Sequence, residues 1–339
     1  MREYDAKLKL KTEAITAHFY FIKYDIKKEE MSILHFFFFS YNEKNGYINV
    51  YEISRFRNEQ NGRGKGGKDV YMLTWKIMDA SGKTKFVAHG EKEVGLVCTM
   101  EYREGDFIIL EHSEESAYLW VQVDECLGSS LVYLTGYLIY HIPFGEGHIS
   151  YPPNAFAGDR HYLFARYATA EEIAQYRNLA VNVNDQHGDT GCYPHATANV
   201  ETRGEAVFAA RNAIDGIVEN HSHGEWPYAS WGINRREDAC FTLEFGREVE
   251  ADKIVIYERA DFPHDNWWKE LTVQFSDETS MVCRLKKTDA GQEITFPKKR
   301  LTWLRLERLI KSDEPSPFPA LTQIQVFGRD VPAEKREAE

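Results

Sequence analysis

Two loop-like stretches hold most of the side chains in this sequence that could do chemistry. The first, HSHGEWPYASWGINRRED (221–238), contains two Trp, two His and two Arg, and its Gly, Pro and Ser residues are typical of loops. The second, RADFPHDNWWKE (259–270), repeats this mixture. Indole rings stack on the flat faces of a ligand, and Arg, Asp and His form directional hydrogen bonds. Together these residue types favour recognition of a flat or ring-shaped ligand.

Strands rather than helices must position these two loops. Short runs rich in Val, Ile, Tyr and Phe recur along the chain, and Gly, Asp, Asn and Ser bound them at a spacing typical of an antiparallel sandwich. Examples are YINVYEI (47–53), DFIILEH (106–112), LVYLTGYLIYHI (131–142), DKIVIYER (252–259) and LTQIQVFG (321–328). We therefore predict an all-β fold with two antiparallel β-sandwich (jelly-roll) domains and a short helical linker.

The one predicted helix divides the chain into these domains. In YATAEEIAQYRNLA (167–180), Thr169 can cap the helix, and Glu171 and Glu172 complement the dipole of its first turn. The lengths on either side lie within the usual range of a domain. The predicted parts are an N-terminal β-sandwich (1–166), the helical linker (167–180), a second β-sandwich (181–330) and a frayed tail (331–339).

Composition excludes several classes of protein. The net charge of -12 argues against a nucleic-acid binder and disfavours docking on anionic lipid. The five Cys are scattered without C-x-x-C spacing, which is poor evidence for a disulfide framework or a structural zinc site. The most apolar run, ILHFFFF (33–39), is too short to span a bilayer. The N-terminus has no apolar signal region, so we expect a cytoplasmic protein as presented, and a secreted one if its leader is missing.

Four features occur in an ordered series through the second half of the chain. They are NLAVN with HATAN (178–182 and 195–199), the A-x-D-G turn in NAIDG (212–216), LEFGREVEADKIVIYER (243–259) and the closing LTQIQVFG (321–328). In this order they resemble a discoidin-type (coagulation factor 5/8 C-domain-like) galactose-binding-like module. That family is an eight-stranded jelly roll common among bacterial carbohydrate-binding modules. The resemblance covers a little under half of the chain, and the texture of the N-terminal half suggests a diverged β-sandwich of similar type.

The resemblance implies a site at the loops of one end of the second sandwich, with an oligo- or polysaccharide as the partner. Carried over to this sequence, those loops are 200–206, 219–238 and 259–270. We expect Trp226 to face outward and Trp231 to be the buried anchor of its loop. The predicted ligand-binding residues are His223, Trp226, Trp231, Asn234, Arg235, Arg259, Asp261, His264, Asp265 and Trp268.

The charge of the sugar stays open at this point. Four arginines lie near the predicted site, namely Arg203, Arg235, Arg236 and Arg259. They make an acidic saccharide attractive, because Arg binds a carboxylate or sulfate with two hydrogen bonds. Asp261 and Asp265 could equally neutralise these cations and leave a site for neutral hydroxyls.

The resemblance also implies a calcium site. The matching turn carries Asp215, whose carboxylate could bind calcium alongside backbone carbonyls. The closing strand, however, has Gln323 where such modules usually show Glu, and the loss of that carboxylate weakens a site for a hard cation. We therefore predict no cofactor and leave calcium near Asp215 open.

Two other functions remain as alternatives to binding alone. A sugar-active enzyme, either a polysaccharide lyase or a glycoside hydrolase, could use the His-rich loop, where His221 and His223 would need His264 or Asp265 as a third zinc ligand. Cys192 is too close in sequence to His195 to form a nucleophile–base pair, and no hydrolase, protease or kinase signature is present. We assign no catalytic residue and no metal ligand. A protein–protein adaptor is the third interpretation.

Overall fold

The computed structural model describes residues 22–28, 31–42, 47–58, 72–188, 190–221, 224–260 and 265–331. The chain divides into two compact units, Met1–Val70 and Tyr71–Glu339, and each is described by itself. The predicted site residues His223, Asp261 and His264 lie outside the described residues. Within the described residues, no helix has the length and apolar character needed to cross a membrane.

The first unit contains a three-stranded antiparallel sheet. Its strands follow the chain in order and are β1 (Ile22–Lys28), β2 (Met31–Asn42) and β3 (Tyr47–Asn58). The apolar run at 33–39 lies within β2, and β2 pairs with β3 along its whole length. This apolar run therefore forms a paired strand.

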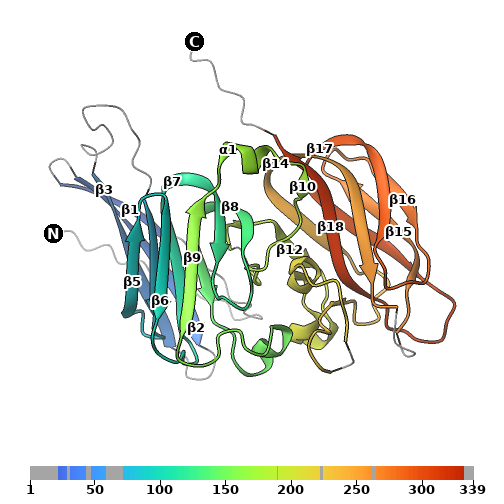
Figure 1. The fold of residues 1–339 in the computed structure, drawn as a ribbon, viewed down its shortest axis with the longest axis horizontal. Helices are drawn as coiled ribbons and strands as arrows, with labels where there is room; N and C mark the ends of the chain where they lie inside the picture. Colours follow the sequence, from blue (N-terminus) through green and yellow to red (C-terminus); the bar gives the residue numbers. More distant parts are fainter. Residues whose placement is uncertain are drawn as a thin grey trace, which may run out of the picture. The chain divides into compact units, whose positions relative to one another are not determined.

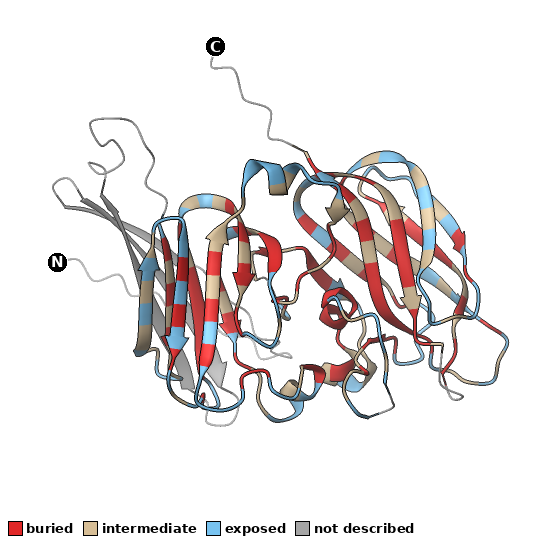
Figure 2. Ribbon diagram, in the orientation of Figure 1, coloured by how far each residue is buried: buried red, intermediate tan, exposed pale blue. Residues whose placement is uncertain are grey.

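The second unit begins with a seven-stranded antiparallel sheet. Its strands are β4 (Leu73–Met78), β5 (Thr84–Gly90), β6 (Glu93–Cys98), β7 (Phe107–Gln122), β8 (Ser130–His141), β9 (His161–Tyr167) and β11 (Cys192–Tyr193). The long strand β7 pairs with β4 near its start and with β9 near its end, and a register shift separates the two parts. Buried and exposed residues alternate along β6, as Figure 2 shows. The inward residues of these strands form one hydrophobic core.

An eight-stranded sheet follows in the same unit. Within this unit the seven-stranded sheet is called the first sheet and the eight-stranded sheet the second. Its strands are β10 (Arg177–Asn178), β12 (His195–Ala198), β13 (Trp231–Gly232), β14 (Phe241–Glu258), β15 (Trp268–Phe275), β16 (Ser280–Arg284), β17 (Gln292–Lys311) and β18 (Ala320–Asp330). All its ladders are antiparallel, and its inward residues form a separate core. The predicted all-β fold built on antiparallel sheets is confirmed.

Helical structure is confined to short connections. They are η1 (Gly145–Ser150), α1 (Ala170–Ala174), η2 (Thr202–Gly204), η3 (Ala206–Phe208) and η4 (Ala210–Ile214), where η denotes a 3-10 helix. The last three, drawn in yellow in Figure 1, pack beside strands of the second sheet.

The helix predicted over 167–180 is present but shorter. Its predicted cap is confirmed, because the Thr169 hydroxyl accepts a hydrogen bond from the Glu172 amide at 3.2 Å and the Glu172 carboxylate accepts one from the Thr169 amide at 2.9 Å. Gln175 already has extended backbone angles. The chain then pairs with strand β18 through Arg177 and Asn178, and this pairing ends the helix.

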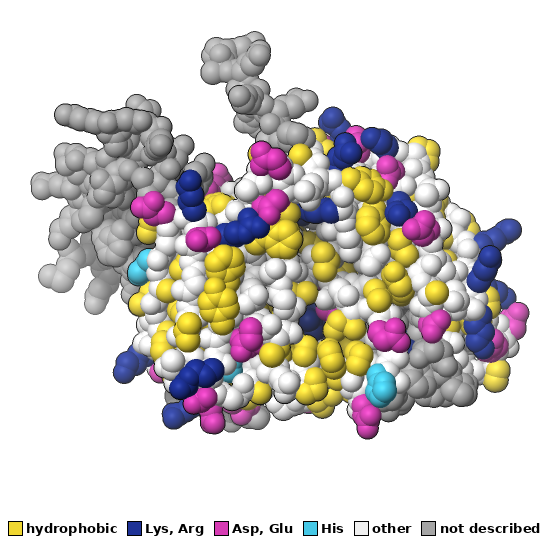
Figure 3. Space-filling model, in the orientation of Figure 1, with side chains coloured by type: hydrophobic (Ala, Val, Ile, Leu, Met, Phe, Trp, Pro, Cys, Tyr) yellow, Lys and Arg dark blue, Asp and Glu magenta, His cyan; other side chains and the backbone are white. Residues whose placement is uncertain are grey.

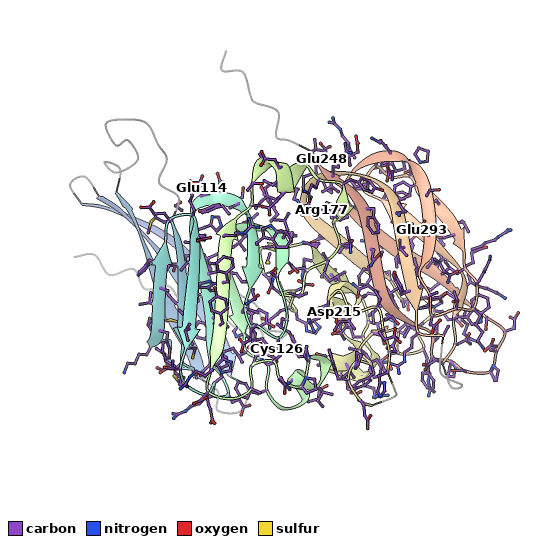
Figure 4. The ribbon with its side chains drawn as sticks, in the orientation of Figure 1. Glu114, Cys126, Arg177, Asp215, Glu248 and Glu293 are labelled. Atoms are coloured by element: carbon purple, nitrogen blue, oxygen red, sulfur yellow. The ribbon has the colours of Figure 1, made fainter. Side chains whose placement is uncertain are left out.

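The segment around β11 and a polar contact connect the two sheets of the second unit. Strand β11 pairs with β8 of the first sheet, although Cys192 and Tyr193 belong to the segment predicted as the second domain. Across the same junction, the Asp330 carboxylate accepts hydrogen bonds from Tyr118, Arg177 and Arg247. Figure 4 shows Arg177 beside α1 and the second sheet. The predicted limits of the two domains stay a prediction, and these contacts join the segments on either side of them.

Candidate ligand-binding pocket

One cavity of about 130 Å³ lies among the loops at an end of the second sheet. Side chains from η2, η3, the turn after β13, the end of β14 and the loop before β18 surround it. The lining residues are Thr202, Arg203, Phe208, Gly232, Ile233, Asn234, Arg235, Arg259, Asp265, Pro317, Phe318, Pro319 and Ala320. Segments more than 100 positions apart in sequence therefore build this pocket.

A buried ion pair forms one part of the wall. Arg259 follows the last residue of β14 and is 2% exposed, and its Nε donates a hydrogen bond to Oδ2 of Asp265 at 3.0 Å. Its Nη1 donates to the backbone carbonyl of Tyr228, which lies in the 219–238 loop. A buried guanidinium held at two positions has a fixed plane. The pocket therefore presents a positioned cation and carboxylate to a ligand.

A tight turn forms the rim. The Arg236 amide donates to the Ile233 carbonyl at 2.9 Å, and the two central residues, Asn234 and Arg235, have positive φ angles of 48° and 63°. Positive φ at both central positions is the feature of a type I′ turn. The amide of Asn234 donates to the Thr202 hydroxyl at 2.9 Å, so that the turn is fixed against η2. Both central side chains are exposed beside the cavity.

The close approach of this turn to η2 depends on a glycine. A Cβ atom on Gly232 would lie 2.6 Å from the Thr202 hydroxyl oxygen and 3.2 Å from the ring of Phe208. Any larger residue would push the turn away from these neighbours. Gly232 thereby sets the width of the pocket at this point.

Two phenylalanine rings supply its apolar walls, and each has an arginine beside it. The guanidinium of Arg203 lies 5.5 Å from the Phe208 ring centroid, and that of Arg235 lies 4.7 Å from the Phe318 ring centroid. Phe318 stands between two prolines in PSPFP (315–319), directly before β18, and is 38% exposed. The sequence analysis missed both phenylalanines. An exposed aromatic held between prolines next to a closing strand is the signal that could have indicated Phe318.

Four of the predicted ligand-binding residues converge on this cavity. They are Asn234, Arg235, Arg259 and Asp265. Trp226 is half-buried and lies in the neighbouring loop, outside the lining, so its contact with a ligand stays a prediction.

Two predicted site residues belong to the core instead. Trp231 and Trp268 are both 0% exposed, and their ring centroids lie 6.1 Å apart. The Trp231 indole donates to the Val200 carbonyl at 2.9 Å, as expected for the buried anchor of its loop. A ring without exposed surface has no face for a ligand, so the prediction that these two residues bind one is corrected.

The calcium positions that the family resemblance implies fit that ion poorly. Burial raises the pKa of the Asp215 carboxyl to about 7, an effect that the Arg211 cation opposes, and the carboxylate already accepts the Ile217 amide at 2.9 Å. Gln323 is completely buried and uncharged, and neither atom of its amide has a hydrogen-bond partner among the described residues. Calcium prefers several anionic oxygens, and these two side chains supply at most one. Figure 4 marks the position of Asp215.

The Cys192 and His195 side chains are also unsuited to nucleophilic chemistry. Cys192 is completely buried, and burial raises the pKa of its thiol to about 12, so the reactive thiolate is disfavoured. His195 is buried as well and lies 2.7 Å from Oδ1 of Asp185, where the pair fixes the start of β12. These residues stabilise the crossing between the two sheets.

Comparison with known proteins gives a family match and similar structures. The family described as a domain of unknown function (DUF7402) matches residues 192–326, a segment that contains every residue lining the pocket. No curated protein matches the sequence. Chitosan-binding module 1 of a chitosanase/glucanase from Paenibacillus sp. IK-5 is 18% identical, with a TM-score of 0.32, and the match covers 44% of this chain and 98% of the module.

Two further structures are similar to a comparable degree. The lectin domain of lectinolysin complexed with Lewis B antigen is 19% identical, with a TM-score of 0.34, and the match covers 45% of this chain and 97% of that domain. A module from Clostridium perfringens in complex with GalNAc-β-1,3-galactose is 22% identical, with a TM-score of 0.30, and the match covers 39% of this chain and 94% of the module. The chain is thus similar over less than half of its length to sugar-binding modules.

Proposed function

We propose that this protein binds a carbohydrate in the pocket between η2, the turn after β13 and the loop before β18, and that it does so without catalysis. The observation that carries the proposal is the composition of the pocket. A buried Arg259–Asp265 pair, two phenylalanine rings and the exposed side chains of Asn234 and Arg235 surround one small cavity.

Each part of the pocket is chemically complementary to one part of a sugar ring. The C–H face of a pyranose packs on an aromatic ring, a role suited to Phe208 and Phe318. Ring hydroxyls both donate and accept hydrogen bonds, and a carboxylate such as Asp265 and an amide such as Asn234 are matching partners. The fixed plane of the Arg259–Asp265 pair then selects the orientation of the hydroxyls.

The size of the cavity limits the bound part of the ligand. Pockets for drug-sized ligands measure about 300–1,000 Å³. The cavity of about 130 Å³ is well below this range and suits one sugar ring. The rest of an oligo- or polysaccharide would extend over the exposed rim at Asn234 and Arg235.

Binding without catalysis is favoured by the number of acidic groups. Glycoside hydrolysis generally uses two carboxyl groups on opposite sides of the scissile bond. Among the described residues that line the pocket, Asp265 is the one carboxylate, and Arg259 already holds it. A nucleic-acid ligand is disfavoured by the net charge of -12 and by the mixture of acidic and basic side chains on the face shown in Figure 3.

A glycan array with two variants tests this proposal. We expect the parent protein to bind a subset of glycans and Phe318→Ala to lose most of that binding, because the variant removes an apolar wall. Tyr162→Ala is the matched control, since Tyr162 is a comparably exposed aromatic residue (43%, against 38% for Phe318) on β9 of the other sheet. Unfolding curves would verify that both variants are folded. Failure of the parent to bind any glycan, or equal binding by the two variants, would refute the proposal.

A further inference from the structure

We infer that the pocket recognises a saccharide that carries a carboxylate, and that Arg235 is the residue that binds this group. The inference rests on the proposed function, since it names the class of sugar for the same pocket. The inference is based on the acidic partners, within the described part of the chain, of the arginines at this end of the sheet.

Three of the four arginines are neutralised. Arg203 forms two hydrogen bonds with the Glu205 carboxylate, at 2.5 and 2.6 Å. Arg236 is paired in the same two-point way with Asp238, its Nε donating at 2.8 Å. Arg259 is paired with Asp265. A guanidinium that already donates two hydrogen bonds to a carboxylate has fewer free N–H groups and less uncompensated charge for an anionic ligand.

Arg235 differs from these three. In the described residues it has no carboxylate within ion-pair distance, and its guanidinium lies instead 4.7 Å from the Phe318 ring centroid. Stacking on a ring orients the planar guanidinium and leaves its N–H edge pointing sideways. The side chain is exposed and lines the cavity, so this edge is accessible to a ligand in the pocket.

The backbone fixes the direction of this side chain. Arg235 has a φ angle of 63°, a left-handed conformation that is unfavourable for a residue other than glycine. The 233–236 turn is nevertheless held by the Ile233 carbonyl on one side and by the Thr202 hydroxyl on the other. A strained, well-supported turn that directs a cation to a pocket is typical of a binding site.

These features select a planar anion as the ligand group. A carboxylate accepts two parallel hydrogen bonds from a guanidinium fork, and such charge-assisted bonds are about twice as strong as neutral ones. A neutral sugar would make no use of the charge of Arg235, which has no acidic partner among the described residues. A sugar ring of the uronic-acid type, with its carboxylate toward Arg235 and its C–H face toward Phe318, satisfies both residues.

A set of matched glycans tests this assignment. The array would hold uronic-acid and sialylated glycans, the same glycans with each carboxyl group reduced to an alcohol, and sulfated and neutral glycans. We expect reduction of the carboxyl group to weaken binding about tenfold or more, the effect of one or two charge-assisted hydrogen bonds. Titration calorimetry with the best carboxylate glycan should also show weaker binding at high salt.

Two neighbouring variants then locate the effect. Arg235→Gln should lose about tenfold in affinity for the carboxylate glycan and should bind the carboxylate and reduced forms alike. Arg236→Gln removes a cation one position away that is also exposed, is paired with Asp238 and does not line the pocket, and it should bind as the parent does. Thermal unfolding of both variants would verify that they are folded.

The outcomes separate this inference from the proposed function. Equal binding of reduced and unreduced glycans, a preference for sulfated ones, or equal affinities of Arg235→Gln and Arg236→Gln would overturn the carboxylate assignment while the carbohydrate pocket stands. If no glycan of any class binds, the proposed function itself is wrong.

Discussion

At the scale of residues, the pocket depends on the pair formed by Arg259 and Asp265. Both are almost completely buried, so each charge is compensated by the other and not by water. A buried charge that loses its partner is strongly destabilising, whereas replacement of a whole pair by apolar residues is often tolerated. The pair therefore serves the site and the fold at once, and its two roles can be separated by single and double substitution.

Arg259→Met should lower the free energy of unfolding by about 3–5 kcal/mol, because Asp265 is then a buried carboxylate without its cation. The double variant Arg259→Met/Asp265→Leu should recover much of this loss, since neither charge of the pair remains. Both variants should fail to bind glycans. Urea unfolding and a glycan array measure the two properties, and a double variant no more stable than the single one would contradict this account.

At the scale of elements, a second buried carboxyl group joins β14 and β15, the strands on either side of the segment that holds Arg259 and Asp265. Glu258 is the last residue of β14 and accepts a hydrogen bond from the Trp268 amide at the start of β15, at 2.6 Å. Gln292 donates to its other oxygen at 3.3 Å. Burial raises the pKa of Glu258 to about 8, although these two hydrogen bonds oppose the shift.

This shift makes stability depend on pH in a defined direction. In the folded protein Glu258 keeps its proton up to a pH of about 8, whereas in the unfolded chain it loses the proton near its ordinary value of 4.5. Between these values the folded state binds more protons, so stability falls as the pH rises, by at most about 1.4 kcal/mol per pH unit. Above the upper value the group has no further effect.

Glu258→Gln should therefore flatten the decrease in melting temperature over this pH window, because the amide carries no charge and still offers an acceptor to the Trp268 amide. Glu293→Gln is the control, since Glu293 is an exposed carboxylate on β17 paired with Lys253. Figure 4 labels its position. Thermal unfolding at several pH values measures the effect. An unchanged pH dependence in Glu258→Gln would show that this carboxyl group is ionised in the folded state.

At the scale of the whole second unit, Asp330 couples its two sheets. Its side chain is 2% exposed and accepts hydrogen bonds from Arg177 and Arg247 of the second sheet and from Tyr118 of the first. The guanidinium of Arg247 also lies 5.4 Å from the Tyr118 ring centroid. Asp330, the last residue of β18, therefore compensates the charges of two arginines of the second sheet and binds the hydroxyl of Tyr118 in the first sheet.

Asp330→Ala should destabilise the protein by about 3–5 kcal/mol, because it leaves two largely buried guanidinium groups without a carboxylate. Asp313→Ala removes an aspartate that is 95% exposed and paired with Lys269, and it should change stability little. Glycan binding by the folded fraction should persist in both, since neither residue lines the pocket. Equal melting temperatures for the two variants would contradict the role of Asp330 as a coupling point.

The sequence predicted the architecture better than the pocket, for physical reasons. A run rich in Val, Leu, Ile and Tyr, such as the predicted strand at 131–142 that forms most of β8, is a local signal, and so is the cap at Thr169. The pairing of β11 with β8 rests on two residues, too few for a recognisable pattern. Trp268 illustrates the limit, because composition placed it at the site and long-range packing buried it, whereas the burial of Trp231 as the anchor of its loop was expected.

The pocket itself was predicted in part. Asn234, Arg235, Arg259 and Asp265 came from two loops singled out by their polar and aromatic content. Phe208 was missed because a single phenylalanine in a sequence rich in aromatic residues gives no sign of facing a cavity. Phe318 was missed although the prolines on either side of it were a usable signal. Their placement depends on η3 and on the 315–319 segment meeting at one end of the sheet.

The most direct test of the central claim is a crystal structure of the protein with the tightest-binding glycan from the array. We predict density for one sugar ring in the cavity, with its face against Phe208 or Phe318 and its polar groups within hydrogen-bond distance of Asn234, Asp265 or the arginines. A glycan bound at any other surface, with this cavity holding only solvent, would contradict the account.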